Sequence, residues 1–259
     1  MKLKKVIYTA LLIMQGGIVV TGGAVRLTGS GLGCPTWPEC TPGSFTPVPH
    51  QAQGTLHSWI EFGNRLLTFA LVFISIAALI GAIKWSKDAF SNSEKRAIRL
   101  LALGQFLGIF AQGILGGITV LTNLNPIPVA GHFLLSLPLI AGALSLRRRI
   151  LHSSDSSSEK SIPLSSITVN LAKLVIALAA VVITLGTVVT GSGPHAGDEK
   201  AKRFGFDPRI VSWLHADVVI ALIFLTIALL LVVKISEKHP KFYRAIWAFL
   251  AICLSQGLI

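Results

Sequence analysis

The chain has 259 residues, of which 52% are apolar and only 13% are charged, and its mean hydropathy is +0.70. A soluble domain typically carries about a quarter charged residues, so this composition excludes a soluble globular protein and indicates residence in lipid. Basic residues outnumber acidic ones, 23 against 11, but they gather in the loops between apolar segments. That placement is typical of a membrane protein and argues against a nucleic-acid partner.

Seven apolar segments follow one another along the chain, and we expect each to cross the membrane as a helix. A crossing needs roughly 20 mostly apolar residues, and a lone segment satisfies its backbone hydrogen bonds in lipid only as a helix. The segments lie near residues 6–26, 56–83, 98–121, 128–146, 168–190 and 211–233, and a seventh opens near 243 and is still running at Ile259. The predicted fold class is an all-α, polytopic bundle of membrane helices.

The basic residues also predict the orientation of the bundle. They stand before the first segment, between the second and third, after the fourth and after the sixth. On the opposite side, the loop between the fifth and sixth segments carries four basic residues, Lys200, Lys202, Arg203 and Arg209. The positive-inside rule therefore predicts a cell-membrane protein with a cytoplasmic N-terminus. We expect the first segment to be a retained helix, because about 20 apolar residues exceed the h-region of a signal peptide.

An internal repeat indicates two halves. The sequence VVTGG ends the first segment (Val19–Gly23), and VVTGS ends the fifth (Val188–Ser192). Coincidental similarity of glycine-rich stretches is the alternative. Between the repeats lies a serine-rich stretch typical of a flexible linker. We expect a first four-helix half at 1–150, a cytoplasmic linker at 151–167, and a pseudo-symmetric second half at 168–259 that is truncated.

Polar residues open the second segment, where lipid would not tolerate them without a reason. They are His57, Glu61, Asn64 and Arg65. At about 100° per residue, His57, Glu61 and Asn64 share one face of a helix. Such a stripe is a candidate functional site, and the alternative for Glu61 is hydrogen bonding that steadies the start of the helix.

Two further histidines occupy equivalent positions. His132 opens the fourth segment and His215 opens the sixth, and the alternation of segments puts both at the same outer depth as His57. A single histidine is more often a packing residue, but three at one depth favour ligands. Zinc prefers a compact set of Cys, His and carboxylate ligands, which is missing here. Imidazoles from facing helices of an apolar bundle suit axial ligation of haem iron.

Two arginines and two cysteines complete the candidates near the outer surface. Arg26 and Arg65 match the carboxylates of haem propionates, or else extend to the membrane interface. Cys34 and Cys40 flank PTWPE in the first outer loop. A cysteine pair in an oxidising exterior readily forms a disulfide, and so short a loop suits either a redox-active bridge or a structural one.

The order and spacing of four motifs carry a resemblance. GLGCPTWPEC, IEFGNR, QGILGGITVLTNLNPIPVAGHF and LHAD together resemble the haem A synthase family, over essentially the whole chain. The resemblance implies eight helices in two pseudo-symmetric four-helix halves. It also implies an oxidoreductase that converts a methyl group of haem O into the formyl group of haem A for cytochrome oxidase assembly, by successive hydroxylations of that carbon.

The same resemblance implies roles for individual residues. Glu61 matches a catalytic carboxylate, His132 an axial ligand of the substrate haem iron in the first half, and His215 an axial ligand of a haem b cofactor in the second half. Cys34 and Cys40 match the cysteine pair of the family's outer loop. Asn64 stands where the family often has a histidine, so either haem O is held by His132 alone or His57, on the same helix face, compensates.

The implied partners are haem O as substrate, haem O synthase and membrane lipid. The alternative function is a b-type haem-binding electron carrier without catalytic activity. Glu61 favours the enzyme, because it shares a helix stripe with the ligand candidates and pure electron transfer does not need a carboxylate there.

Overall fold

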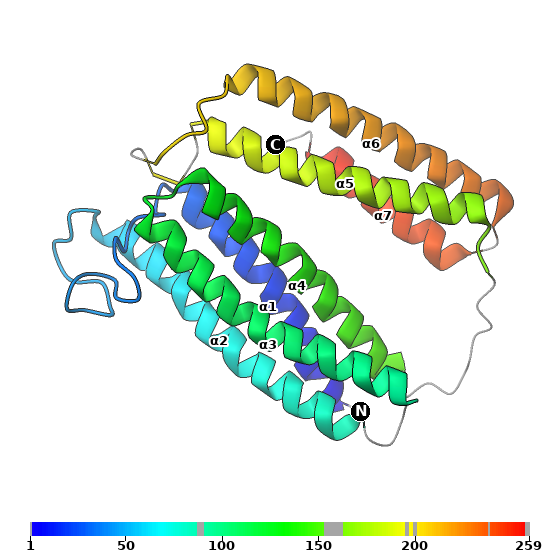
Figure 1. The fold of residues 1–259 in the computed structure, drawn as a ribbon, viewed down its shortest axis with the longest axis horizontal. Coiled ribbons are helices and arrows are strands. Elements are labelled where there is room, and N and C mark those ends of the chain that lie inside the picture. Colours follow the sequence, from blue (N-terminus) through cyan, green and yellow to red (C-terminus); the bar gives the residue numbers. More distant parts are fainter. Residues whose placement is uncertain are drawn as a thin grey trace. The chain divides into compact units, whose positions relative to one another are not determined.

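A computed structural model describes residues 2–86, 91–152, 163–194, 197–198, 201–237 and 239–256, and the elements in these ranges are all α-helices (Figure 1). The helices are α1 (Lys2–Leu27), α2 (Thr55–Trp85), α3 (Asn92–Leu121), α4 (Pro126–His152), α5 (Ser166–Ser192), α6 (Pro208–Ser236) and α7 (Pro240–Gln256). Within the described ranges, α1 to α6 are each long and apolar enough to cross a membrane. The predicted all-α membrane fold is therefore confirmed, and the chain is a multi-pass membrane protein.

The helices extend beyond the apolar segments because polar residues cap their ends. Ser91 precedes α3, and its side chain accepts a hydrogen bond from the backbone N–H of Glu94 at 3.3 Å. Asp207 precedes α6 and accepts one from the N–H of Arg209 at 2.8 Å, with Pro208 at the first helical position. Such caps satisfy backbone donors that the first helical turn leaves without partners.

Contacts divide the chain into two compact units. The first contains residues 1–157 and 193–204, and the second contains residues 158–192 and 205–259. Much of the predicted linker, residues 153–162, lies outside the described residues. The assignment of a substrate half and a cofactor half stays a prediction.

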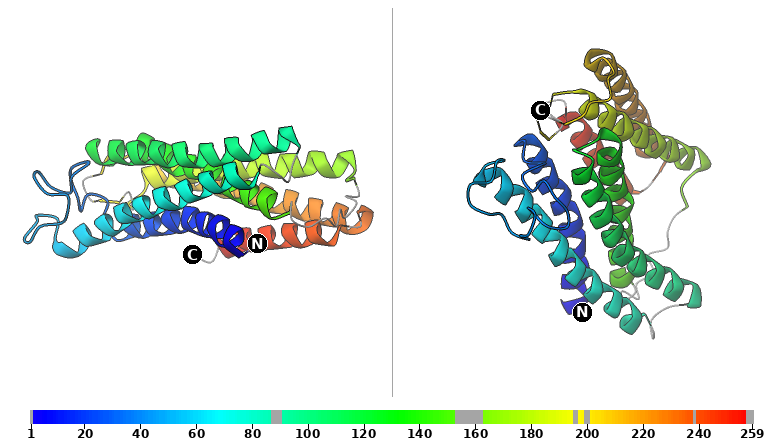
Figure 2. Two further views of the ribbon diagram at one scale, coloured as in Figure 1. Left: turned by 90° about the horizontal axis from the view of Figure 1, so that it is seen from below. Right: turned by 60° about the vertical axis from the view of Figure 1, so that its left-hand side comes forward.

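The first unit is a four-helix bundle. Each of α1, α2, α3 and α4 packs against two of the others, and contacts between α1 and α4 close the ring. The four helices run side by side in Figure 1 and in both views of Figure 2. Its core consists of buried residues from all four helices, including Leu11, Leu71, Ile109 and Leu146.

Close packing between helices and hydrogen bonds of buried glutamine side chains hold this bundle together. Lipid tails are as apolar as leucine, so membrane helices associate through packing and interhelical hydrogen bonds. A Cβ on Gly108 of α3 would lie 2.3 Å from Cδ2 of Leu139 in α4, so glycine allows the Leu139 side chain to contact α3 in its present position. The Gln15 side chain donates to the Gln105 side chain at 3.0 Å, and Gln105 donates to the carbonyl oxygen of Leu139 at 2.9 Å. These contacts join α1, α3 and α4.

The second unit consists of α5, α6 and α7, with α6 in contact with both other helices. Its core includes Val175, Leu222, Leu229 and Leu250. The predicted seventh segment forms α7, which has 17 described residues.

Candidate functional site

The segment between α1 and α2, residues 28–54, forms a long loop that we call the disulfide loop. The end of the first unit that carries it is the loop end. Cys34 and Cys40 are joined by a disulfide, and both are fully buried. The predicted bridge is therefore present in the structure. A redox role for it stays a prediction.

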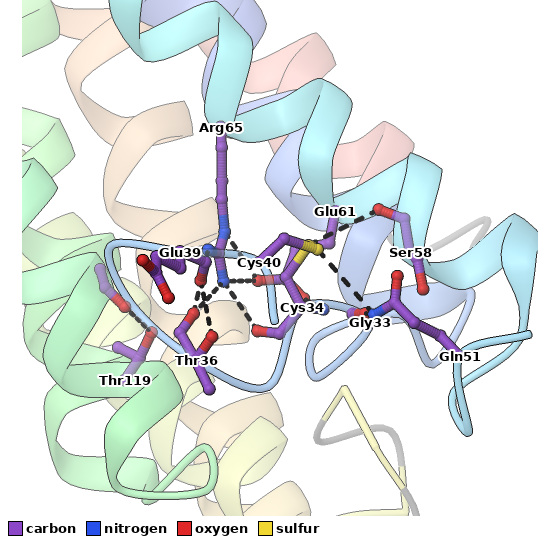
Figure 3. A network of polar contacts seen from close by, with 11 residues as sticks. Gly33, Cys34, Thr36, Glu39, Cys40, Gln51, Ser58, Glu61, Arg65 and Thr119 are labelled. Carbon is purple, nitrogen blue, oxygen red and sulfur yellow. Dashed lines mark hydrogen bonds and ion pairs between the residues drawn. A yellow bond between two sulfur atoms is a disulfide. The ribbon is translucent and has the colours of Figure 1, made fainter. Parts of the chain in front are cut away.

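The disulfide loop is docked on α2 by an ion pair (Figure 3). Oε1 of Glu61 lies 2.5 Å from Nη2 and 3.1 Å from Nε of Arg65, one turn further along the helix. Oε2 of Glu61 accepts a hydrogen bond from the backbone N–H of Cys34 at 2.6 Å. Both carboxylate oxygens are thus engaged, and Glu61 is buried, with 6% of its surface exposed.

Arg65 completes this docking through the main chain of the loop. Its guanidinium donates to the carbonyl oxygens of Cys34 at 2.8 Å, Thr36 at 3.0 and 3.1 Å, and Glu39 at 3.2 Å. A planar guanidinium suits such a set because its donors have a fixed fork geometry. Removing one member of a buried ion pair leaves an uncompensated charge, at a typical cost of about 3–5 kcal/mol. The pair therefore fixes the path of the loop over α2.

Glycine allows the loop to lie this close. A Cβ on Gly33 would be 2.3 Å from the carbonyl oxygen of His57 and 2.6 Å from its carbonyl carbon. Any other side chain would collide with the backbone of α2. This contact could not be predicted from the sequence, because it depends on where the loop lies in space.

The other polar residues of α2 contact α1 and the loop that follows it. Nδ1 of His57 lies 2.9 Å from Oγ of Ser30, and Oδ1 of Asn64 accepts a hydrogen bond from the Thr21 hydroxyl at 2.6 Å. The structure thus brings His57, Glu61 and Asn64 together with the disulfide loop and α1.

Of the two predicted propionate contacts, Arg65 has its guanidinium on the loop carbonyls. Arg26, half-buried near the end of α1, lies beside the backbone of Gly197. For both arginines, contact with a propionate stays a prediction.

His132 lies at the loop end of α4, against a glycine of α3. A Cβ on Gly116 would be 3.3 Å from Cε1 of the His132 ring. Nδ1 of His132 is buried and has no hydrogen-bond partner among the described residues. Its backbone oxygen accepts from Ser136, whose hydroxyl accepts from Gln112 of α3 at 2.9 Å. The sequence analysis missed Gln112, although an amide inside an apolar segment was a signal.

His215 in the second unit has a similar environment. A Cβ on Gly186 of α5 would be 3.4 Å from Cε1 of His215 in α6. Its Nδ1 atom is also buried without a hydrogen-bond partner in the described part of the chain. In each unit, therefore, an imidazole packs against a glycine of the preceding helix.

These two imidazoles fit the role of haem-iron ligands. A ring nitrogen that bonds to no protein group stays available to a metal, and each glycine lets the imidazole lie close against the neighbouring helix. Axial ligation needs one or two such residues, each from one helix. Within the described ranges, no group of three or more His, Cys, Asp or Glu residues could hold a bare metal ion.

Fold and site thus define a multi-pass helical membrane protein with a docked disulfide loop and two histidines suited to metal ligation. Residues 5–197 match the family described as COX15-CtaA, cytochrome oxidase assembly protein. This match covers well over half of the chain, so the chain belongs to that family. The predicted resemblance is therefore confirmed for residues 5–197, whereas His215 lies beyond the matched stretch.

Individual relatives carry the name "Heme A synthase". The protein from Geobacillus kaustophilus is 29% identical over 153 residues, which cover 56% of this chain and 44% of the relative. The protein from Lysinibacillus sphaericus is 33% identical over 128 residues, 49% of this chain and 38% of the relative. The protein from Bacillus pumilus is 31% identical over 149 residues, which cover 57% of this chain and 45% of the relative. The matched stretches span less than half of each relative's length.

Proposed function

We propose that the protein is a haem A synthase, an oxidoreductase that converts a methyl group of haem O into the formyl group of haem A for cytochrome oxidase assembly. The observation that carries the proposal is the family match over residues 5–197, which includes the disulfide loop, Glu61 and His132. The relatives named "Heme A synthase" match parts of this chain, which supports the same reaction.

In this proposal His132 holds the iron of haem O and His215 holds the iron of a haem b cofactor. When bound, the haem iron supplies the redox chemistry, while the protein supplies ligation, orientation and exclusion of water. Two successive hydroxylations, each a two-electron oxidation of the carbon by an external oxidant (dioxygen, or water together with an electron acceptor), turn the methyl carbon into a gem-diol, and loss of one water leaves the aldehyde. His57 is the candidate second contact for haem O, because Asn64 is a poor iron ligand.

Glu61 is the proposed catalytic carboxylate. It would accept a proton or stabilise positive charge that develops on the substrate. Its pairing with Arg65 and its hydrogen bond from Cys34 support a fixed, charged position for the group. Arg26 and Arg65 remain candidates for the propionates.

The proposed setting is the cell membrane, with a cytoplasmic N-terminus and the loop end facing outward. Alternation of basic residues between loops supports this orientation. Haem O synthase is the proposed supplier of the substrate.

Pigment extraction tests the function. The protein is purified from a host that makes haem B and haem O, and the bound macrocycles are separated and identified. Haem B together with haem O and haem A is the expected result. Haem B alone would favour a b-type electron carrier instead.

A matched pair of variants links the result to the site. His132→Ala should deplete haem O, whereas His152→Ala, at the opposite end of α4, should retain it. Equal haem O in both variants would contradict the ligand assignment.

A further inference from the structure

We propose that Trp37, in the disulfide loop, contacts the edge of the haem macrocycle held by His132 and so helps to position the substrate. Trp37 is then a positioning residue of the first unit, beyond the ligands and the carboxylate. This inference rests on the proposed function, since it takes haem O as the ligand of His132.

The first step of the argument is that the loop has a fixed place. Arg65 and Glu61 bind its main chain at Cys34, Thr36 and Glu39, on both sides of Trp37 (Figure 3). The Cys34–Cys40 disulfide closes the same stretch covalently. The side chain of Trp37 therefore projects from a short segment whose backbone is held at both ends.

The second step is where that side chain lies. A Cβ on Gly117 of α3 would be 2.5 Å from Cδ2 and 2.6 Å from Cε2 of the Trp37 indole. The ring thus rests directly on the backbone of α3 at a position that only glycine permits. Gly117 is buried beneath it, while 40% of the Trp37 surface stays exposed. The indole therefore packs against α3 with part of its surface and leaves the rest accessible to a ligand.

The third step connects the indole to His132. The residue before Gly117 is Gly116, and a Cβ there would be 3.3 Å from Cε1 of His132. Successive residues of a helix differ by about 100° in direction and 1.5 Å along the axis. The rings of His132 and Trp37 therefore contact adjoining sides of α3 at the same depth. A macrocycle bound through His132 is much wider than an imidazole, so its edge can reach a ring that lies on the adjoining side of α3.

An indole in that place has a favourable interaction to offer. Aromatic rings attract each other in offset or edge-to-face arrangements, beyond the area they bury. One such aromatic contact typically changes a binding equilibrium constant by about 2- to 10-fold. The other role for a tryptophan at this depth is that of an anchor at the membrane interface, which is general to membrane proteins and predicts no effect on haem.

The experiment compares four variants with wild type, all purified from the haem O-producing host. Trp37→Ala removes the indole, and Trp37→Phe keeps a smaller ring. Gly117→Ala keeps the tryptophan at position 37 but pushes its indole away from α3. Gly104→Ala is the matched control on α3, because a Cβ there meets nothing within 4 Å. The measured quantity is haem O plus haem A per haem B, and alkylation with mass analysis verifies the disulfide in each sample.

We expect Trp37→Ala and Gly117→Ala to retain about 2- to 10-fold less haem O plus haem A per haem B. Trp37→Phe should fall between them and wild type, and Gly104→Ala should match wild type. If Trp37→Ala does not fold, the ratios measured for Gly117→Ala and Trp37→Phe test the proposal.

Wild-type ratios in all Trp37 and Gly117 variants would overturn the inference and leave the proposed function intact. A lower membrane yield with unchanged ratios would assign Trp37 to interfacial anchoring and overturn it too. Wild-type protein that holds haem B alone would instead remove the proposed function, and the inference with it.

Discussion

The Glu61 carboxylate is shared between two partners of different kinds, and this sharing defines what a substitution there would test. Oε1 pairs with Arg65 on the same helix, and Oε2 receives the N–H of Cys34 from the loop. A role in chemistry and a role in loop docking are therefore combined in one side chain. Separating them requires a change that removes charge but keeps the shape of the group.

Glu61→Gln is that change. If Glu61 handles a proton or stabilises positive charge, haem A formation should fall by about 10²–10⁴-fold, because general acid–base groups contribute that much. Haem O should still bind, since the amide oxygen can accept the hydrogen bond from Cys34 and Arg65 keeps its own hydrogen bonds to the loop carbonyls. The measurement is the haem A to haem O ratio in extracted pigment.

The control for this substitution is Glu94→Gln, which neutralises the glutamate that pairs with Arg149. It should leave the haem A to haem O ratio unchanged. Wild-type haem A yield from Glu61→Gln would restrict the carboxylate to loop docking.

The position of the disulfide loop depends on Gly33, because a side chain there would meet the backbone of α2. Gly33→Ala should force the loop away from the His57 carbonyl, because the new Cβ would meet backbone atoms at 2.3 and 2.6 Å. Overpacking of this kind typically costs about 1–3 kcal/mol. We expect a lower melting temperature in detergent and faster reduction of the Cys34–Cys40 bridge.

Gly63→Ala in α2 serves as the comparison for Gly33→Ala, since a Cβ at Gly63 meets nothing within 4 Å. It should melt at the wild-type temperature or above. A Gly33→Ala protein with unchanged melting and reduction rates would show that the loop can shift without cost.

In the second unit, at the end of α6 that lies away from His215, a carboxylate joins α6 to the start of α5. Oε1 of Glu237, which follows α6, accepts hydrogen bonds from the backbone N–H of Ser165 at 2.9 Å and from the Thr168 hydroxyl at 2.7 Å. Hydrogen bonds from Ser165 and Thr168 lower the pKa of the Glu237 carboxyl below its usual value. The charged form is thus favoured in the folded state.

A lowered pKa in the folded state gives stability that is present above the unfolded pKa and is lost as pH falls through the folded pKa. The protection factors of amide hydrogens in the first turn of α5, which compare the measured exchange rates with the intrinsic rates at each pH, should therefore fall in acid. Glu237→Gln should speed exchange there at neutral pH and abolish this acid dependence. Identical exchange profiles for the variant and wild type between neutral and acidic pH would contradict this role.

The elements could be predicted from sequence to a greater extent than the site. Apolar segments of about 20 residues define helices in lipid without reference to the rest of the fold, and α1 to α6 lie where those segments predicted them. The contacts of Arg65 with the loop carbonyls, and of Gly116 with His132, depend on the path of a loop and the rotation of each helix. Packing sets both, so sequence periodicity alone could not reveal them.

For the whole molecule, a variant in the second unit tests the proposed cofactor assignment. His215→Ala should deplete haem B, because that imidazole is the proposed ligand in the second unit. Membrane insertion should persist, since it depends on the hydrophobicity of the segments. Haem B per protein is measured in purified samples, with His239→Ala as the control. A normal haem B content in His215→Ala would remove the cofactor assignment.

Among the described residues of the disulfide loop, Arg65 donates its hydrogen bonds to main-chain carbonyl oxygens. Carbonyl oxygens are common to every amino acid, so this anchor places little demand on the identity of the residues between the two cysteines. Homologous loops can therefore diverge in sequence and still dock in the same way, provided that the arginine, the glutamate and a glycine at position 33 persist. Variation among these loops would then change the side chains that the loop presents near the site without changing the hydrogen bonds that hold the loop on α2.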